Sequence, residues 1–542
     1  MVPPQQSRSP RQSRSLIGGF FRSLLANPSS PTLELGDLLL SYEQLWDYAG
    51  RITAYLKDNL DPPEKVVAVL ADRSVAAYGG ILGVLGSGRG YVPLNPKFPL
   101  ERTLVMLRAS GCKTLVVGKE CAAVLESLLS RLPEYLDHPL TLVIPDPGWE
   151  PDRKLLSSHR VISASQLSTV AEPSDPVVDQ NDTAYLLFTS GSTGMPKGVA
   201  VSQSNAVAYM EYVAKRFGIH PGDRCSQNFD LTFDLSVHDL FTCWDGGATL
   251  CPYAEQTLTP ATLIEEKELT CWFSVPSVAM FASKVGLLEP GAFPTLRWSL
   301  FCGEALSSTL ATAWQAAANN SILENLYGPT EATIAITYYR WDQATSPAEC
   351  VRGLVPIGWP FDGQQVCTVD DDLVPVPTGE SGELCLGGSQ VTRGYLNDPE
   401  KTAKSFVHLK HTQDQVWYRT GDLVRQDQRG CLFYLGRRDF QVKVNGYRVE
   451  LQEIDLVLRE AARTELAVAI PWPLSDGSAS GIVGVLSGSD PVNDKQIIAA
   501  CETRLPRYMV PNRIYHFPQI PLNVNGKIDR GKITEMLANW GR

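Results

Sequence analysis

Apolar residues in this chain occur either in short continuous runs or at the spacing of a helix. Between residues 40 and 60 they recur every three or four positions, which predicts an amphipathic helix. The short runs Val66–Leu70, Leu115–Val117 and Leu140–Ile144 predict buried strands separated by helical stretches. Strands that alternate with helices favour a parallel sheet covered by helices on both faces, so we expect an α/β fold.

The same alternation continues further along the chain, with more polar residues where strands end. Three later strands are expected within Leu269–Ser277, Leu296–Glu304 and Leu323–Ile336, and each runs into a loop with apolar and charged residues. Loops at the carboxyl ends of neighbouring strands meet at one edge of an open α/β sheet and form ligand pockets there. The prolines of Gly88–Pro99 instead predict a rigid turn across a sheet edge.

A change in the pattern of residues near the end of the chain predicts a second domain. An aromatic strand, a polar turn and a new strand follow one another in Cys431–Val449, and the best boundary lies at Gly436–Asp439. We therefore expect a core domain over residues 16–436 and a compact α+β domain over residues 437–542. Residues 1–15 are rich in Pro, Ser, Gln and Arg, which is typical of a disordered leader.

Composition excludes several classes of protein. The 542 residues carry a formal net charge of −11, whereas nucleic-acid binding would favour basic patches. No apolar run approaches the ~20 residues that span a bilayer. Arg22 interrupts the apolar stretch after Leu16, which argues against a secretory signal. The 12 cysteines lack metal-ligand spacing and are expected to be reduced and buried, as in a cytoplasmic protein.

One stretch, Thr189–Gly198 (TSGSTGMPKG), points to chemistry. It follows the apolar run Ala184–Phe188 and combines small hydroxyl residues, glycines and a lysine, groups that wrap phosphate oxygens. A Walker-type P-loop is an alternative, but it needs Ser or Thr after the lysine, and Gly198 follows Lys197 here. A flexible Ser/Gly linker would not need to follow a buried strand or to carry Pro-Lys-Gly.

TSGSTGMPKG resembles the phosphate loop of the adenylate-forming enzymes, which include acyl-CoA synthetases, luciferases and the adenylation domains of peptide synthetases. Further motifs of the family follow in the right order between Ser41 and Arg530, among them LYGPTE, YRTGD and NVNGKIDR. The resemblance implies a large N-terminal domain of stacked αβα layers with a small β-barrel-like subdomain, and a small mobile C-terminal α+β domain. It also implies that a carboxylate reacts with ATP to give an acyl-adenylate, which is then passed to a thiol.

The resemblance assigns catalytic roles to Thr189, Glu331 and Lys527. Glu331 would bind Mg²⁺, because this hard cation takes carboxylate and phosphate oxygens together. Lys527 follows an Asn-Gly turn and would contact the substrate carboxylate and the α-phosphate as charge develops there. The ATP-binding residues implied by the family motifs are Thr189, Ser190, Gly191, Ser192, Thr193, Gly194, Lys197, Asn325, Leu326, Tyr327, Gly328, Pro329, Thr330, Asp422, Tyr434, Arg437 and Lys527.

The family also implies two arrangements of the C-terminal domain, which would pivot at Asp439. One arrangement places Lys527 for adenylation, and the other brings the segment around Lys443 and Gly446 to the site and opens a thiol tunnel. The chain ends at Arg542, soon after Lys527, whereas a carrier domain would be far longer. We therefore expect a free-standing enzyme whose partner is a separate phosphopantetheinylated carrier protein.

Asp234 separates the substrate classes of the family. In the amino-acid-activating branch an Asp at this place pairs with the substrate α-ammonium, and a buried carboxylate without such a cation would be costly. The rest of the pocket is mostly apolar, which predicts a small uncharged amino acid, and His238 is either a polar contact or part of the wall. The pocket residues carried over from the family are Asp234, Leu235, His238, Phe273, Leu300, Cys302, Leu326, Ile334, Ala335 and Lys527.

Two groups within the family have a similar lining, the free-standing L-proline adenylating enzymes and the D-alanine–carrier-protein ligases. Phe273, Leu300 and Leu326 leave a slot that suits a ring better than a methyl group, so we favour L-proline and keep D-alanine as the alternative. An acyl-CoA synthetase-like enzyme with a non-amino acid would not need Asp234. A catalytically inactive relative should have lost the catalytic residues, which are all present.

Overall fold

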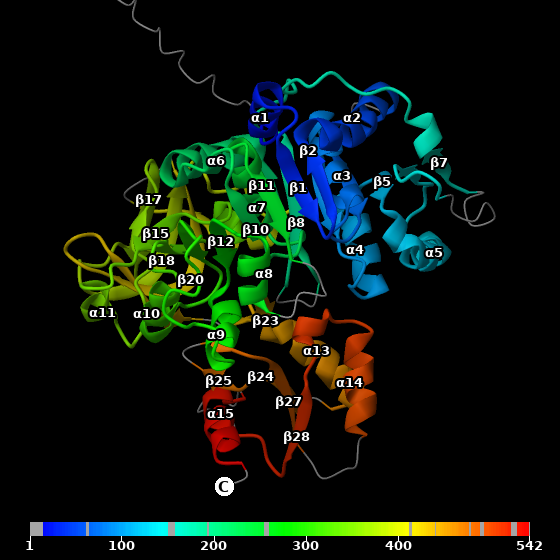
Figure 1. The fold of residues 1–542 in the computed structure, drawn as a ribbon. Helices are drawn as coiled ribbons and strands as arrows, with labels where there is room; N and C mark the ends of the chain where they lie inside the picture. Colours follow the sequence, from blue (N-terminus) through cyan, green and yellow to red (C-terminus); the bar gives the residue numbers. More distant parts are fainter. Residues whose placement is uncertain are drawn as a thin grey trace, which may run out of the picture.

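The structure, a computed structural model, describes most of the chain. A large N-terminal part carries three sheets, and a smaller part formed by residues 441–540, which we call the lid, lies against one end of it (Figure 1). The described residues are 15–60, 64–149, 158–191, 195–253, 259–410, 415–438, 441–464, 466–475, 478–487, 493–521 and 528–540.

The first sheet contains the strands predicted early in the chain. Its seven strands are parallel except for the last pair, β8 and β9, which run antiparallel. This arrangement confirms the expected parallel α/β sheet. In spatial order the strands are β7 (Arg160–Ser163), β6 (Thr141–Ile144), β5 (Thr114–Val117), β3 (Val66–Leu70), β4 (Gly90–Leu94), β8 (Thr183–Thr189) and β9 (Lys197–Ser202).

The predicted turn at Gly88–Pro99 is wrong over its first half. Gly90–Leu94 is the buried strand β4, which lies between β3 and β8. β4 pairs with β3 along its whole length, but it pairs with β8 only at Tyr91 and Tyr185. Proline is tolerated there because few backbone hydrogen bonds are made on the side of β8. Pro93 therefore lies where the hydrogen-bond ladder on that side is not continued.

The second sheet supplies most of the strand ends that surround the site. Its strands from β1 to β14 are parallel neighbours, and β2, β15 and β16 extend it antiparallel at the two ends. In spatial order they are β16 (Trp359–Pro360), β15 (Thr337–Arg340), β14 (Ile322–Tyr327), β13 (Trp298–Phe301), β12 (Cys271–Ser274), β10 (Arg224–Gln227), β11 (Thr249–Pro252), β1 (Pro31–Leu35) and β2 (Leu38–Ser41).

Helices cover and join these two sheets, and one large apolar cluster spans both. Capping boxes at Ser41 and Ser202 start α2 and α6, because each serine pairs reciprocally with the residue three positions on. The α-helices of this part are α1 (Gly18–Ala26), α2 (Tyr42–Asn59), α3 (Val75–Gly86), α4 (Leu100–Ser110), α5 (Ala122–Arg131), α6 (Gln203–Phe217), α7 (Leu235–Asp245), α8 (Pro260–Glu266), α9 (Pro276–Lys284), α10 (Ser308–Ala317), α11 (Ser346–Glu349) and α12 (Pro399–Ser405).

A third, antiparallel sheet of five strands corresponds to the expected small β subdomain. Its strand β20 pairs with β21, and this places Asp422 opposite Arg437. Short 3₁₀ turns complete this part at Lys119–Cys121, Leu132–Glu134, Ala164–Gln166 and Thr330–Ala332. The five strands are β17 (Gln364–Val369), β18 (Ser381–Gly388), β20 (Val416–Gln426), β19 (Phe406–His408) and β21 (Leu432–Arg437).

The lid is an α+β unit with apolar clusters of its own, as expected for a separate domain. Residues 439–440 at the expected boundary lie outside the described chain, so the domain limits stay predictions. The elements of the lid are β22 (Gln441–Val444), β23 (Tyr447–Glu450), α13 (Leu451–Ala462), β24 (Ala467–Pro471), β25 (Leu474–Ser475), β26 (Ser478–Ala479), β27 (Ile482–Ser487), α14 (Asp494–Glu502), a 3₁₀ turn (Arg507–Met509), β28 (Arg513–Phe517) and α15 (Arg530–Ala538).

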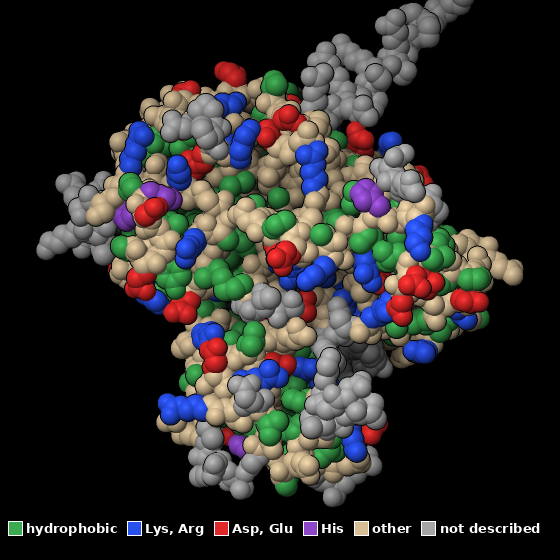
Figure 2. Space-filling view, turned by 180° about the vertical axis from the view of Figure 1, so that it is seen from behind, with side chains coloured by type: hydrophobic (Ala, Val, Ile, Leu, Met, Phe, Trp, Pro, Cys, Tyr) green, Lys and Arg blue, Asp and Glu red, His purple; other side chains and the backbone are tan. Residues whose placement is uncertain are grey.

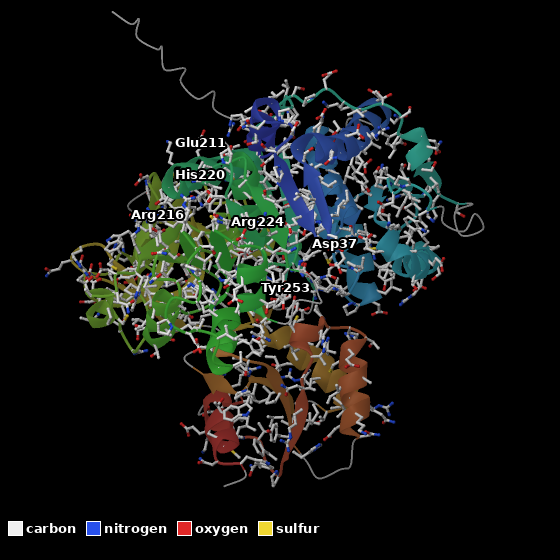
Figure 3. All side chains as sticks on the ribbon, viewed as in Figure 1. Asp37, Glu211, Arg216, His220, Arg224 and Tyr253 are labelled. Atoms are coloured by element: carbon white, nitrogen blue, oxygen red, sulfur yellow. The ribbon has the colours of Figure 1, made fainter. Side chains whose placement is uncertain are left out.

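The cysteine side chains follow the expectation from composition, and the charged side chains are of both signs. Positive and negative side chains are interspersed over the face seen in Figure 2, and the cysteines are all free, most of them buried. Buried Glu324 is paired with Arg216 (2.7 Å), labelled in Figure 3, and with Arg340 (2.8 Å). Of the predicted leader, only Ser15 belongs to the described chain, and it is buried.

Candidate functional site

A cavity of about 620 Å³ lies where the N-terminal part meets the lid. Strand ends of the second and third sheets and strand β22 of the lid surround it. Of the strand ends expected to converge, Leu296–Glu304 and Leu323–Ile336 contribute to its lining, whereas Leu269–Ser277 does not. Its volume is that of a typical ligand site. Predicted site residues that line it are Asn325, Tyr327, Asp422, Tyr434, Arg437 and Lys443.

The aromatic end of this cavity has one unused hydrogen-bond acceptor. Asn325 donates its Nδ2 to the carbonyl of Pro356 (2.9 Å), while its buried Oδ1 has no partner among the described residues. Tyr327 is buried at the end of the same strand, and the ammonium of Lys443 lies 5.9 Å from its ring centroid. A flat apolar face beside a free carbonyl oxygen suits a heteroaromatic ring that carries an amino group.

Asp422 is held rigidly between strands. One carboxylate oxygen accepts a hydrogen bond from the hydroxyl of Tyr327, and the other pairs with Nη1 of Arg437 at 2.6 Å. The pairing of β20 with β21 brings Asp422 and Arg437 together, so the strand register itself forms this ion pair. Fixed in this way, the Asp422 carboxylate can accept further bonds from a ligand hydroxyl.

The phosphate-loop residues Thr189, Ser190, Gly191 and Lys197 are described, whereas Ser192, Thr193 and Gly194 lie outside the described residues. Thr189 ends β8 opposite Lys197 at the start of β9, and its buried hydroxyl has no partner within the described chain. Burial, with Arg448 nearby, lowers the pKa of Lys197 to about 8. An unpartnered hydroxyl beside a buried lysine is a suitable environment for phosphate oxygens.

Glu331 is fully buried on the 3₁₀ turn Thr330–Ala332 and is surrounded by donors. It accepts hydrogen bonds from Arg448 (2.7 Å) and the hydroxyl of Tyr395 (2.7 Å), and Nζ of Lys197 lies 3.5 Å away. Burial alone would raise the pKa of Glu331, but the charges of Arg448 and Lys197 hold it well below the usual range. Glu331 is therefore ionised at neutral pH.

Asp234 is a second buried carboxylate, and its surroundings differ from those of Glu331. It stands at the N-terminus of α7 without capping the helix, and it borders a cavity of about 60 Å³ together with Leu235, Cys302 and Thr330. Burial raises the pKa of Asp234 to about 6. Hydrogen bonds from Thr330 and from the backbone N–H of Ile334 lower the pKa, but their effect is smaller than that of burial. No cationic side chain of the described chain forms an ion pair with it.

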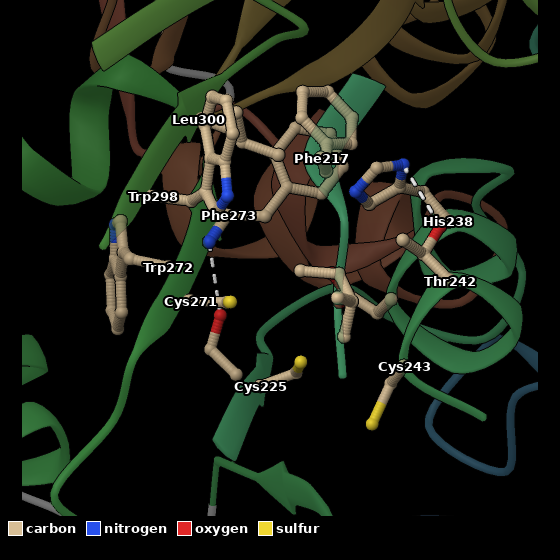
Figure 4. A pocket seen from close by; sticks show the side chains of 13 residues that line it. Phe217, Cys225, His238, Thr242, Cys243, Cys271, Trp272, Phe273, Trp298 and Leu300 are labelled. Atoms are coloured by element: carbon tan, nitrogen blue, oxygen red, sulfur yellow. Dashed lines mark hydrogen bonds between the residues drawn. The ribbon is translucent and has the colours of Figure 1, made fainter. Parts of the chain in front are cut away.

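The remaining predicted pocket residues that the structure describes are all buried, but the structure does not bring them to one cavity: Leu235 and Cys302 line the cavity beside Asp234, whereas His238, Phe273 and Leu300 line another. The rings of His238 and Phe273 lie 4.5 Å apart, and behind them lies a separate cavity of about 20 Å³, lined by Leu300 and several thiols (Figure 4). Nδ1 of His238 is 2.7 Å from the hydroxyl of Tyr209, and burial lowers the pKa of His238 to about 3. His238 is therefore a neutral wall residue, with its Nδ1 engaged by Tyr209.

Gln390 positions the loop that carries Ile334 and was missed by the sequence analysis. Thr333 and Ile334 both adopt positive φ values (57° and 71°), which is costly for β-branched residues. The amide of fully buried Gln390 donates towards the carbonyls of Ala332 (3.3 Å), Thr333 (3.2 Å) and Ala335 (2.7 Å). This role is visible only in the folded structure, because nothing in the sequence around Gln390 indicates that its side chain donates to the carbonyls of a distant loop.

The lid is docked with its β22–β23 hairpin in the site. Lys443 and Gly446 of this hairpin line the same cavity as Asp234, and their part in thiol transfer stays a prediction. The backbone N–H of Gly446 donates to Glu304, and a Cβ on Gly446 (φ +82°) would come within 2.4 Å of Val275. Lys527 and Asp439 lie outside the described residues, and Arg530, three positions after Lys527 in the sequence, pairs with Asp455 inside the lid.

Comparison with known proteins identifies the family. The model of the family described as AMP-binding enzyme matches residues 20–396. The chain belongs to the AMP-binding enzyme family. This confirms the resemblance read from the phosphate loop, together with the α/β fold class and the enzyme class, an adenylate-forming ligase.

Individual members of the AMP-binding family show how much of the chain is shared. A D-alanine–D-alanyl carrier protein ligase of Listeria welshimeri is 32% identical, with 94% of this chain and 96% of that protein covered. Tyrocidine synthase 3 of Brevibacillus parabrevis is 32% identical over 93% of this chain, which spans only 7% of that protein. The crystal structure of the Vibrio cholerae adenylation domain AlmE in complex with glycyl-adenosine-5′-phosphate is 33% identical, with a TM-score of 0.87 and 99% of both chains covered.

The geometry fits the nucleotide that the AMP-binding family name implies. Asn325 Oδ1 and the Thr189 hydroxyl are buried and have no hydrogen-bond partner among the described residues, so each has capacity for a bond to a ligand. Among described residues, no group of three or more His, Cys, Asp or Glu side chains could hold a metal, so Mg²⁺ at Glu331 would need phosphate oxygens as further ligands. No helix within the described ranges is long and apolar enough to cross a membrane.

Replacing Gln390 by alanine should lower the free energy of unfolding by about 1–3 kcal/mol, because buried carbonyls around strained Thr333 and Ile334 lose their donor. Urea denaturation measures the change. Gln365→Ala, at an exposed position of β17, is the matched control and should stay within about 0.5 kcal/mol of the unchanged protein. Equal stability of the two variants would show that the loop does not depend on Gln390.

Proposed function

We propose that the chain activates a small, uncharged α-amino acid with ATP and then transfers the aminoacyl group to the phosphopantetheine thiol of a separate carrier protein. The observation that carries this proposal is Asp234, a buried carboxylate without a cation among the described residues. A substrate α-ammonium would supply the missing charge. The D-alanine–carrier-protein ligase and the glycyl-adenylate complex among the relatives support an amino acid as the substrate.

In the first half-reaction the substrate carboxylate attacks the α-phosphorus of ATP, and pyrophosphate leaves. Asp234 would hold the ammonium, Asn325 and Tyr327 the adenine, and Asp422 the ribose hydroxyls. Thr189, with Lys197 beside it, would bind phosphate oxygens, and Glu331 would hold Mg²⁺, which neutralises phosphate charge when bound. Lys527 is proposed to stabilise the charge that develops between carboxylate and α-phosphate.

In the second half-reaction the carrier thiol, losing its proton, attacks the acyl carbon, and AMP leaves. The hairpin with Lys443 and Gly446 would border the path of the phosphopantetheine arm, and Gly446 lets the hairpin pack closely against Val275, where a Cβ would clash. Rotation of the lid about Asp439 is proposed to exchange this arrangement for one with Lys527 at the site. The domain limits at 16–436 and 437–542 are part of this proposal.

For the side chain we propose L-proline, with D-alanine as the alternative. The cavity of about 60 Å³ beside Asp234 supports a small substrate. A pyrrolidine ring buries about two more methylenes than a methyl group, each worth ~0.8 kcal/mol. An acyl-CoA synthetase-like reaction with a non-amino acid is disfavoured, because it would leave Asp234 without its cation.

Amino-acid-dependent ATP–pyrophosphate exchange tests the proposal. L-Proline should be used about ten- to a hundredfold better than L-alanine, and carboxylic acids without an amino group should give no exchange. Better use of D-alanine or glycine would overturn the proline assignment and leave adenylation in place. Exchange with propionate or benzoate but with none of the amino acids would refute the proposal as a whole.

The acidity of Asp234 gives a pH-dependent signature. Its pKa of about 6 means that the carboxylate becomes protonated as the pH falls below 6 and can no longer pair with an ammonium. The KM for the amino acid should then rise about tenfold per pH unit below 6, while the KM for ATP changes little. The measurement is the exchange rate against amino-acid concentration between pH 5 and 8.

Two variants complete this test. Asp234→Asn should raise the amino-acid KM by the equivalent of about 2–5 kcal/mol and abolish its pH dependence. Asp37→Asn, on the exposed turn labelled in Figure 3, is the control and should behave like the unchanged protein. A pH-independent KM in the unchanged protein would place the ammonium elsewhere.

A further inference from the structure

The loop at the 3₁₀ turn Thr330–Ala332 bonds directly to Asp234. The backbone N–H of Ile334 donates to Oδ2 of Asp234 at 3.3 Å, and the side chain of Thr330 bonds to the same carboxylate. A further bond comes from the backbone of Leu235, whereas Asp234 forms no side-chain cap on its helix. The orientation of the Asp234 carboxylate therefore depends on where this loop lies.

The loop does not keep its shape through its own backbone preference. Thr333 and Ile334 have φ values of 57° and 71°, which β-branched residues avoid. Rotation of the peptide unit between these two residues would return the φ of Ile334 to a negative value. The same rotation would turn the N–H of Ile334 away from Asp234, so a group outside the loop must hold this peptide unit.

Gln390 holds the peptide unit from the opposite side. Its Nε2 donates to the carbonyl of Thr333 at 3.2 Å, between the neighbouring carbonyls of Ala332 (3.3 Å) and Ala335 (2.7 Å). In a planar trans peptide, the C=O of Thr333 and the N–H of Ile334 point in opposite directions. A donor that fixes the oxygen therefore also fixes the direction of the N–H that reaches Asp234.

Two further amide side chains hold Gln390 in place. The backbone N–H of Gln390 donates to Oε1 of Gln364 on β17 at 3.2 Å. Nδ2 of Asn205 on α6 donates to the carbonyls on either side of it, those of Ser389 (2.7 Å) and Val391 (3.2 Å). The side chain of Gln390 is fully buried, so solvent water does not replace its bonds when they are lost.

We propose that Gln390 is a positioning residue for recognition of the substrate ammonium, because it holds the peptide unit between Thr333 and Ile334 that orients Asp234. It acts through this one peptide unit and not by contact with the substrate. The inference rests on the proposed function in placing the ammonium at Asp234. A carboxylate oriented in advance binds an ammonium more tightly than one that is ordered only on binding.

The test compares two stable adenylate mimics by titration calorimetry, prolyl-sulfamoyl-adenosine and the analogue in which CH₂ replaces the ring nitrogen. The ratio of their affinities reports on the ammonium, because the two compounds are otherwise alike. The unchanged protein should prefer the amino compound at least about thirtyfold. Gln390→Met keeps most of the side-chain volume but has no donor, and its preference should be about tenfold smaller, the effect of losing one hydrogen bond to a charged group.

Two further variants keep the test decisive if Gln390→Met folds poorly. Gln390→Asn retains an amide but is one methylene shorter, so it should lose the bonds to the loop and a similar part of the preference. Leu128→Ala on α5 is the control for stability, since Leu128 is buried in a separate apolar cluster. The cavity left there should destabilise the fold and leave the ratio of affinities unchanged.

An undiminished preference in Gln390→Met or in Gln390→Asn would overturn the inference alone. An equal loss of preference in Leu128→Ala would also overturn it, because reduced stability would then be the cause. Equal affinity of the unchanged protein for the two mimics would instead overturn the placement of the ammonium at Asp234, and with it the proposed function.

Discussion

The requirement that buried carboxylates be compensated is the constraint on which this site depends. Glu331 and Asp234 are both removed from water, yet only Glu331 has cations beside it in the described chain. Arg448 and Lys197 keep Glu331 ionised, whereas Asp234 is left with hydrogen bonds alone and an elevated pKa. Two carboxylates in one site thus have different properties because their surroundings differ, and the less compensated one is the natural partner for a cationic substrate.

Much of the fold followed from hydrophobic pattern. Val66–Leu70 became a strand with the predicted limits, because a short apolar run between helical stretches has little alternative to a buried parallel strand. Gly90–Leu94 is also a strand, but the sequence does not predict it, because Pro93 indicates a turn and only the neighbouring strands show that a proline is tolerated there. Local propensity failed there because tertiary pairing decided the conformation.

The site could be predicted only in part, and the limit is again physical. Motifs singled out Asn325, Tyr327 and Asp422, which the strand ends and the strand register bring to one cavity. Gln390 could not be found, because its role arises from the strained backbone of a loop that lies far away in sequence. The hydrogen bond from Gly191 to Glu453 of the lid and the ion pair of Glu453 with Arg102 likewise depend on how two separately packed units dock, which no periodicity within either unit encodes.

The central claim is that Asp234 receives the ammonium of an amino acid held as an adenylate. The most direct measurement compares the binding of two stable adenylate mimics, prolyl-sulfamoyl-adenosine and the analogue in which CH₂ replaces the ring nitrogen. The account predicts that the amino compound binds at least about thirtyfold more tightly, the equivalent of the ~2 kcal/mol expected for a buried charge pair. Equal affinity of the two compounds would contradict it.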